Sequence, residues 1–257
     1  MRTTYAVCTT VGRVRKENQD NFYLNGITKP VHVQEIALEG TSEEKYQLFA
    51  VCDGMGGETD GEIAAYVAVE FLKKNPAETF SDEWQNYLLD VNDAICDYQE
   101  NNECSTGTTF AGVHINDDKL QAINLGDSRI YYIQDNKMIQ LSKDHTEFQE
   151  LVDAGVLKPE DFSNSVTHNY LTQSLGVDLE EELLEPYVSK QISMADGDMI
   201  LICSDGLYGT VSNDEMTEIL SGNESIALKS QKLVDLAEKN GSTDNITALI
   251  IRISNPQ

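Results

Sequence analysis

Two apolar segments of the sequence end in an aspartate followed by glycine. Residues 48–52 lead directly into Asp53, and residues 199–203 lead through one serine into Asp205. A short apolar run bounded by turn residues is typical of a buried strand, and glycine lets the main chain come close to a ligand. Each segment would therefore place a carboxylate at the end of a strand, a suitable position for a metal ligand. Asp-Gly is also a common turn dipeptide, so either site alone is equally compatible with a plain turn.

Three further aspartates stand at the ends of predicted strands. Asp20 opens residues 20–24, Asp127 follows residues 120–125, and Asp244 precedes the last apolar segment. Carboxylates that crowd together repel one another unless they are protonated or bind a cation. A ligand set of oxygens without His or Cys favours Mg²⁺ or Mn²⁺ over Zn²⁺. The five acids therefore indicate a divalent-cation site, provided that these strand ends meet in space.

The charge balance bears on the kind of partner. Against 18 Lys and Arg stand 44 Asp and Glu, a formal net charge of −26 in 257 residues. Such a charge argues against nucleic acid or an anionic membrane as a partner, because both need basic patches. An anionic substrate would need bound divalent cations to attract it. An acidic surface can also serve solubility alone.

Other bulk features favour a cytoplasmic protein. No apolar run approaches the roughly 20 residues that span a bilayer, and the N-terminus has no apolar region of the signal-peptide kind. The five cysteines are odd in number and include no C-x-x-C pair. We therefore expect reduced thiols in the cytoplasm.

The hydrophobic pattern predicts an α+β fold in a single domain over residues 1–257. Runs of strands interrupted by helix pairs suggest stacked sheets covered by helices. Residues 27–45 are polar and compatible with a hairpin. We expect a helix from near Ser81 that presents Trp84 to the core. The other predicted helices are residues 61–74, 147–154, 213–220 and 225–239, and the predicted strands are residues 4–11, 20–24, 46–52, 106–115, 119–125, 129–134, 138–141, 187–192, 198–204 and 247–253.

Eight short motifs follow one another in a recognisable order. They are Gly12-x-x-Arg15-x-x-Asn18-Gln-Asp20, Val51-Cys-Asp53-Gly-Met-Gly-Gly57 with Gly61-Glu62, Gly107-Thr-Thr, Gly126-Asp-Ser-Arg129, Asp144-His-Thr146, Leu171-Thr-Gln-Ser-Leu-Gly176, Cys203-Ser-Asp-Gly-Leu207 and Thr243-Asp-Asn-Ile-Thr247. Each motif is weak alone. Together, over residues 4–253, the chain resembles the metal-dependent serine/threonine protein phosphatases (PPM, or protein phosphatase 2C type) in their compact bacterial form.

The resemblance implies a four-layer α-β-β-α sandwich, two antiparallel sheets flanked by helices, with two Mn²⁺ or Mg²⁺ ions in a cleft at the edge of the sheets. The acid matching Asp53 bridges both ions, and the glycine matching Gly54 gives its carbonyl to one of them. The acid matching Asp20 serves the second ion. Those matching Asp205 and Asp244 serve the first.

The resemblance also assigns the substrate side of the site. The acid matching Asp127 helps to hold a more labile third ion, and the arginine matching Arg15 is the catalytic and substrate-binding residue that clamps the phosphoryl group. Two close metals acidify a bridging water, which attacks phosphorus in line, and an Arg fork binds two oxygens as Lys cannot. The implied reaction is hydrolysis of phosphoserine and phosphothreonine in proteins that a kinase has phosphorylated. We expect a monomer.

The sequence departs from the family pattern at three places. Glu58 stands where many relatives have a His that can protonate the leaving group, and a carboxylate is a poor acid at neutral pH. His145 and His168 are alternative proton donors. Gln19 replaces a frequent Glu, and Gln173 stands where Arg is common. Residues 146–170 correspond to a variable flap beside the cleft, which we expect to influence the choice of phosphoprotein.

Two other interpretations compete with an active phosphatase. The first is a phosphatase-like binding or sensor domain with little turnover, which the Glu58 substitution favours and the complete set of acids opposes. The second uses Asp196-Gly-Asp198, which resembles the D-x-D nucleophile of haloacid-dehalogenase-type phosphatases. That motif follows an apolar strand in those enzymes, whereas here it precedes one, so a turn is the better interpretation.

Overall fold

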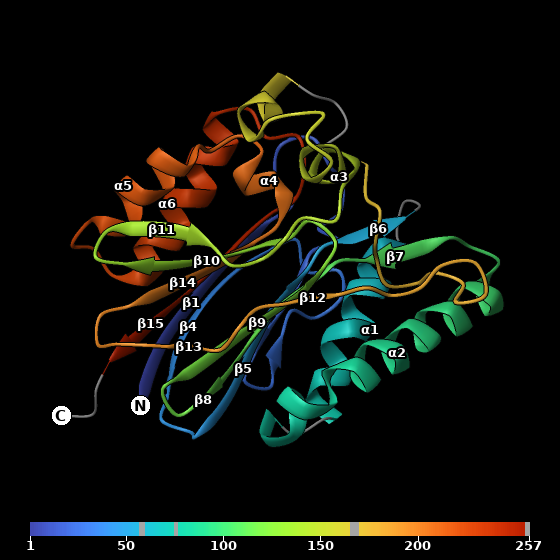
Figure 1. Cartoon of the computed structure of the whole chain (residues 1–257), viewed down its shortest axis with the longest axis horizontal. Coiled ribbons are helices and arrows are strands. Elements are labelled where there is room, and N and C mark those ends of the chain that lie inside the picture. Colours follow the sequence, from blue (N-terminus) through green and yellow to red (C-terminus); the bar gives the residue numbers. More distant parts are fainter. Residues whose placement is uncertain (57–59, 75–76, 165–169, 255–257) are drawn as a thin grey trace.

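Two antiparallel β-sheets lie face to face, and helices cover the outer face of each sheet (Figure 1). The computed structural model describes residues 1–56, 60–74, 77–164 and 170–254. In this part of the chain the layers follow the order helix, sheet, sheet, helix, so the prediction of an α+β four-layer sandwich is confirmed. No helix in these ranges is both long enough and apolar enough to cross a bilayer.

The first sheet has the strand order β11-β10-β14-β15-β1-β4. The second has the order β12-β9-β8-β5-β2-β3, with β13 also paired to β9, and β6 pairs with β7 beside it. The strands are β1 (Arg2–Thr10), β2 (Asn21–Leu24), β3 (Ile27–Thr28), β4 (Glu35–Ser42), β5 (Tyr46–Cys52), β6 (Gly54–Gly56), β7 (Thr106–Thr108), β8 (Phe110–Asn116), β9 (Lys119–Leu125), β10 (Arg129–Gln134), β11 (Lys137–Gln140), β12 (Tyr187–Val188), β13 (Ile192–Ser193), β14 (Met199–Cys203) and β15 (Ile246–Ser254).

Three apolar clusters fill the three spaces between the layers. The first lies between the sheets, the second between the first sheet and the C-terminal helices, and the third between the second sheet and the first two helices. Along each strand, consecutive residues pack into different clusters, because successive side chains point to opposite faces of the sheet. The helices are α1 (Asp60–Lys74), α2 (Ala77–Asn102), α3 (Glu147–Asp153), α4 (Asp205–Tyr208), α5 (Asn213–Ser221) and α6 (Ile226–Lys239), with a 3₁₀ turn at Pro159–Asn164.

Several predicted boundaries are corrected by the structure. Helix α2 begins at Ala77 rather than near Ser81, and its first turns are anchored by buried Phe80, whose ring packs against Tyr87. Residues 106–115 form two strands, because β7 turns away to pair with β6 while β8 pairs with β5. The polar segment 27–45 is not a hairpin, since β3 pairs with β2 and β4 crosses to β1 in the other sheet.

The strand register brings the acid-bearing strand ends to one end of the stack. In the first sheet Thr10 pairs with Ile246 where β1 ends and β15 begins, and β14 ends beside them. In the second sheet Asn21 pairs with Cys52 where β2 begins and β5 ends. Helix α4, which the sequence did not predict, lies at this end of the molecule (Figure 1).

Candidate metal centre

Asp53 is held by its backbone at the mouth of the second sheet. Its carbonyl accepts the amide of Thr109 at 2.9 Å and the hydroxyl of Thr108 at 3.0 Å, and its own amide donates to the Thr109 hydroxyl at 3.0 Å. A Cβ at Gly54 would lie 2.0 Å from the carbonyl oxygen of Gly61. Only glycine therefore fits after Asp53, because the start of α1 packs directly on the turn.

Asp20 lies inside the stack and is hydrogen-bonded on one side only. Its Oδ2 accepts the hydroxyls of Ser204 at 2.7 Å and Thr247 at 2.6 Å, and the residue is 0% exposed. Among the described residues, its Oδ1 and the Oδ1 of Asp205 are buried oxygens without a hydrogen-bond partner. Unpaired buried acceptors are costly, so both oxygens are suited to a bound cation.

Each of the other four strand-end aspartates acts electrostatically on Asp53. Burial raises its pKa most, and the charges of Asp20, Asp205, Asp244 and Asp127 raise it further, in that order. Burial is also the first cause that raises the pKa of Asp205 well above its usual value. It raises the pKa values of Asp20 and Asp127 to about 6. For Asp53 burial is the largest cause and the neighbouring like charges add to it, which indicates that these acids lie near one another.

The donor set fits Mn²⁺ or Mg²⁺ in chemistry. Its oxygens are the hard ligands that these ions prefer, and two of them are buried and unpaired. Within the described ranges, no three His, Cys, Asp or Glu side chains already converge as a formed metal site. The charges of Asp20, Asp205, Asp244 and Asp127 act on Asp53, which indicates that these carboxylates lie near one another. One of them, Asp244, is engaged by Arg15.

Arg15 forms a forked ion pair with Asp244. Its Nε donates to Oδ1 at 2.9 Å and its Nη2 to Oδ2 at 2.6 Å, and the Arg15 side chain is 55% exposed. This hydrogen bonding is the main cause that raises the pKa of Arg15, and the charges of Asp205 and Asp53 also contribute. Arg15 thus contacts a strand-end acid from the loop before Asp20. Its guanidinium lies at the rim of the candidate site.

Asp127 is positioned by a chain of contacts that the sequence did not reveal. It follows Gly126, whose φ of +96° favours glycine. The Tyr208 hydroxyl lies 3.0 Å from its carbonyl oxygen and 3.1 Å from its Oδ2. The guanidinium of Arg129 stacks 3.7 Å from the centre of the Tyr208 ring and binds the carboxylate of Asp144, with Nη2 at 2.6 Å. Arg129 and Asp144 come from two of the eight motifs, so their pairing joins those motifs in space.

The residues that depart from the family pattern have different outcomes. Glu58 and His168 lie outside the described residues. The Nδ1 of His145 accepts the amide of Gly126 at 3.1 Å, and burial lowers the pKa of this histidine. Gln173 ties down the segment that follows it: its Nε2 donates to the carbonyl of Leu183 at 3.0 Å, and its Oε1 accepts the amide of Glu185 at 2.8 Å.

The dehalogenase-like motif is a turn. Gly197 has a φ of +91°, and the amide of Asp198 bonds back to the carbonyl of Ala195 at 3.2 Å. The Asp198 carboxylate is buried and accepts hydrogen bonds from Tyr132 and from the Ala195 amide. It stands before β14, whereas Asp205 follows that strand, so the two lie at opposite ends of the sheet.

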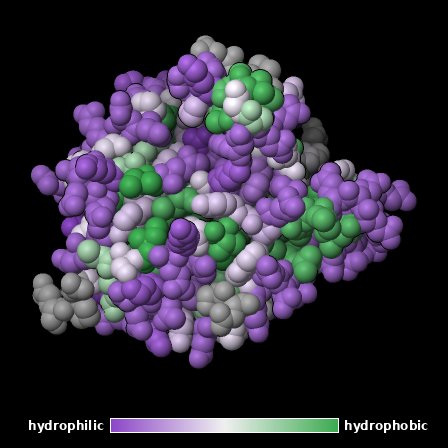
Figure 2. Space-filling model, viewed as in Figure 1, coloured by the Kyte–Doolittle hydropathy of each residue, from purple (hydrophilic) through white to green (hydrophobic). Residues whose placement is uncertain are grey.

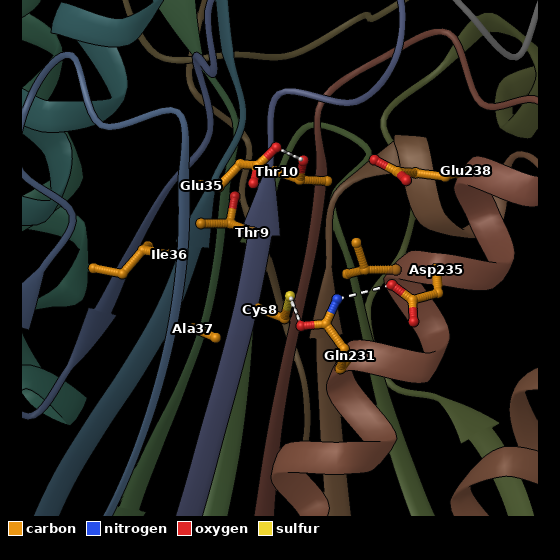
Figure 3. Close-up of a pocket in the computed structure, with 10 residues that line it drawn as sticks. Cys8, Thr9, Thr10, Glu35, Ile36, Ala37, Gln231, Asp235 and Glu238 are labelled. Carbon is orange, nitrogen blue, oxygen red and sulfur yellow. Dashed lines mark hydrogen bonds between the residues drawn. The ribbon is translucent and has the colours of Figure 1, made fainter.

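An acidic cavity of about 390 Å³ lies between β1, β4 and α6 (Figure 3). Glu35, Asp235 and Glu238 surround it, and the Cys8 thiol donates to Gln231 at 3.3 Å. Burial raises the pKa of Cys8 to about 12, so this thiol is not a nucleophile at neutral pH. None of the five strand-end aspartates lines this cavity.

Comparisons with known proteins identify the family of this chain. The protein phosphatase 2C family model matches residues 37–238. The chain is 32% identical over 250 residues to the serine/threonine phosphatase stp of Listeria innocua, covering 93% of this chain and 92% of the relative. It is 29% identical over 259 residues to the protein phosphatase PhpP of Streptococcus pneumoniae, covering 97% of each.

Solved structures of phosphatases share the fold. The Mycobacterium tuberculosis serine/threonine phosphatase PstP/Ppp superposes with a TM-score of 0.83 at 26% identity, over 99% of this chain and 100% of that one. The catalytic domain of the serine/threonine protein phosphatase PstP in complex with two manganese ions superposes with a TM-score of 0.80, also at 26% identity, over 99% and 100% of the chains. The chain described here therefore belongs to the protein phosphatase 2C family of protein serine/threonine phosphatases.

Proposed function

We propose that this protein is a Mn²⁺- or Mg²⁺-dependent phosphatase that removes phosphate from phosphoserine and phosphothreonine in proteins. The observation that carries the proposal is the carboxylate of Asp53 surrounded by four other strand-end aspartates, with one buried unpaired oxygen each on Asp20 and Asp205. The two manganese ions reported for the catalytic domain of PstP support a two-cation site here. A third ion near Asp127 belongs to the same proposal.

Each strand-end acid would have a separate share in holding the cations. Asp53 would bridge two ions, with the carbonyl of Gly54 beside it on one of them. Asp205 and Asp244 would serve the first ion and Asp20 the second, and Asp127 would serve the labile third. The bound cations would supply charge neutralisation and an acidic water that serves as the nucleophile.

Arg15 would bind two phosphoryl oxygens with the fork that now holds Asp244. Its planar guanidinium matches the spacing of these oxygens and stabilises charge that develops on them. Asp20 would stay oriented through Ser204 and Thr247, which hold its other oxygen. The reaction needs no covalent phosphoenzyme, and the products are the free hydroxyl side chain and phosphate.

The biological setting follows from the same chemistry. The substrates would be phosphorylated proteins, and the enzyme would oppose a protein kinase as a monomeric single domain over residues 1–257. All five cysteines are free, which supports a reducing, cytoplasmic compartment. The acidic surface disfavours nucleic acid and anionic membrane as partners.

The test is hydrolysis of p-nitrophenyl phosphate and of a phosphothreonine peptide with added Mn²⁺, with chelator-treated enzyme and Asp53→Asn as controls. We expect turnover that requires the cation and falls to background in the variant. Equal rates for the wild-type and variant proteins would instead leave a binding or sensor domain.

A further inference from the structure

An apolar groove lies between helix α2 and the segment 178–186. It has a volume of about 230 Å³ and is lined by Trp84, Gln85, Asn86, Leu88, Leu89, Leu184 and Pro186. Leu89 is 41% exposed, and Leu183, next to the groove in sequence, is 72% exposed. Figure 2 shows apolar surface in green on this side of the molecule, where Figure 1 places α2. Clustered exposed apolar side chains of this kind mark interaction sites.

The two chain segments that supply the walls of the groove carry acids and no bases. No Lys or Arg occurs between residues 75 and 118 or between residues 159 and 189. The exposed acids of helix α2 are Glu78, Glu83, Asp90, Asp93, Asp97 and Glu100, and those of the segment 178–186 are Asp178, Glu180, Glu181, Glu182 and Glu185. An apolar floor with a rim of one charge sign selects a ligand that is apolar in the middle and of opposite charge at its edges.

The second wall of the groove is physically continuous with the candidate metal centre. The backbone of Leu175 exchanges hydrogen bonds with Thr108 at 2.9 and 3.1 Å, and Thr108 pairs with Gly54 next to Asp53. Farther along, Gln173 fastens the backbone at Leu183. A chain bound in the groove would therefore lie against a segment that begins beside the catalytic acids.

We propose that this groove docks a segment of the phosphoprotein substrate that combines bulky apolar side chains with Lys or Arg. The inference rests on the phosphatase function proposed above and adds a substrate class to it. The apolar side chains would fill the space between Trp84 and Leu184, and the cations would face the glutamates at the rim. A second copy of this chain and an anionic membrane are disfavoured, because both would bring negative charge to an acidic rim.

The groove contains its own reporter, because Trp84 is the only tryptophan of the chain. The probes are three short synthetic peptides without aromatic residues. One alternates Leu and Lys with helical periodicity, one has Glu in place of Lys, and one has Ser in place of Leu. We expect the Leu/Lys peptide to change Trp84 emission and to bind at least about tenfold more tightly than either reference peptide. Equal binding of the Leu/Lys and Ser/Lys peptides would overturn the proposal, since it would show non-specific attraction by the net charge.

Two matched pairs of variants locate the binding site. Leu89→Asp should weaken the Leu/Lys peptide about tenfold or more, whereas Ile139→Asp, at a 58% exposed position on β11, should not. Glu182→Lys should weaken binding more than Glu218→Lys on α5, although both change the net charge equally. If the members of each pair behave alike, the peptide binds elsewhere and the proposal is wrong.

Activity measurements separate this proposal from the phosphatase function itself. All four variants should hydrolyse p-nitrophenyl phosphate like the wild type, whereas Leu89→Asp should raise the KM for a phosphopeptide that carries the Leu/Lys segment. If the wild type does not hydrolyse p-nitrophenyl phosphate, the phosphatase function is contradicted. The result of the peptide-binding measurement would still stand. The peptide could fail to bind while the protein forms dimers or binds phosphatidylserine vesicles. If Leu89→Asp abolishes that association, the groove has another occupant and the proposal is wrong.

Discussion

The guanidinium of Arg15 and the carboxylate of Asp244 neutralise each other through two hydrogen bonds, at 2.9 and 2.6 Å. The same two residues would serve different ligands in the proposed reaction, a phosphoryl group and a cation. Both side chains are partly exposed, 55% and 33%, and exposed ion pairs contribute only about 0–1 kcal/mol. The pair can therefore open at little cost when both ligands bind, and until then it keeps Arg15 next to the acids.

Replacement of Arg15 by Lys tests whether the fork matters rather than the charge. Lys cannot bind two oxygens of one group in a fixed plane, so we expect kcat/KM for a phosphopeptide to fall about 10–100-fold, the loss of roughly 1.5–3 kcal/mol expected for a charge-assisted contact. The control is Arg13→Lys in the same loop, where the side chain is 62% exposed. A loss of the same size in both variants would show a general effect of the loop.

Asp53→Asn separates the cation site from folding. The substitution removes the negative charge at the centre of four others, so without metal we expect a higher free energy of unfolding in urea, because buried like charges repel. With Mn²⁺ the order should reverse, since the wild type alone gains stability from binding. Isothermal titration calorimetry should show Mn²⁺ binding lost or greatly weakened. Asp196→Asn, in the turn before β14, should change neither quantity, and unaltered Mn²⁺ binding by Asp53→Asn would contradict the site.

Asp53 and Asp205 could be predicted to lie at strand ends because each follows a local pattern, an apolar run and then a turn. That pattern identified Asp53 and Asp205, and the registers of the two sheets then brought their strand ends together. The partners of Asp20 could not be predicted. The hydroxyl of Ser204, which donates a hydrogen bond to Asp20, is 184 residues away in the sequence. Ser204 and Thr247 belong to two of the eight motifs. That membership is the only sequence signal that they contribute to the site.

Other parts of the fold depend on long-range packing that a linear pattern does not contain. Tyr208 contacts Asp127 only because the short helix α4 turns back over the strand ends. Strand β4 joins the first sheet although its neighbours β3 and β5 belong to the second. Its alternation of exposed and half-buried residues is that of an edge strand, but alternation does not say which sheet the strand completes.

His145 gives the protein a pH dependence with a defined sign. Burial lowers its pKa from 6.5, so the folded state prefers the neutral ring, which accepts the Gly126 amide. This contribution to stability is complete above pH about 6.5 and is lost as the pH falls through the lower folded-state pKa. NMR titration should show His145 protonating below its ordinary pKa of 6.5. His145→Gln should reduce the slope of unfolding free energy against pH below about 6.5, and a slope that does not change would rule out this role.

Tyr208→Phe removes one hydroxyl and keeps the ring on which Arg129 stacks. The carboxylate of Asp127 would lose a hydrogen bond of 3.1 Å, a contribution of about 0.5–1.5 kcal/mol. We expect the Mn²⁺ concentration for half-maximal activity to rise about 3–10-fold, with a small change in kcat at saturating Mn²⁺. Tyr170→Phe, at a 55% exposed position, is the control. A large fall in kcat at saturating Mn²⁺ would instead give Tyr208 a direct part in the reaction.

The last prediction concerns a buried ion pair that fastens the Asp20 loop to α1. Lys29 is 0% exposed, and its Nζ donates to the carbonyls of Asn18 and Val33, at 2.9 and 3.1 Å, and to Glu62 at 3.0 Å. Lys29→Met leaves the Glu62 carboxylate buried without its cation, so we expect a loss of about 3–5 kcal/mol in the free energy of unfolding in urea.

The double variant Lys29→Met/Glu62→Gln should recover part of that loss, because it removes the uncompensated charge together with its partner. Lys45→Met, at an exposed pair with Asp117 3.9 Å away, should cost much less, because exposed ion pairs contribute little to stability. If Lys29→Met were no more destabilising than Lys45→Met, the buried pair would not be what holds the loop. If the double variant were less stable than Lys29→Met, the Glu62 charge would be stabilised by its contacts with His32, the backbone amide at 2.6 Å and the ring Nδ1 at 3.3 Å.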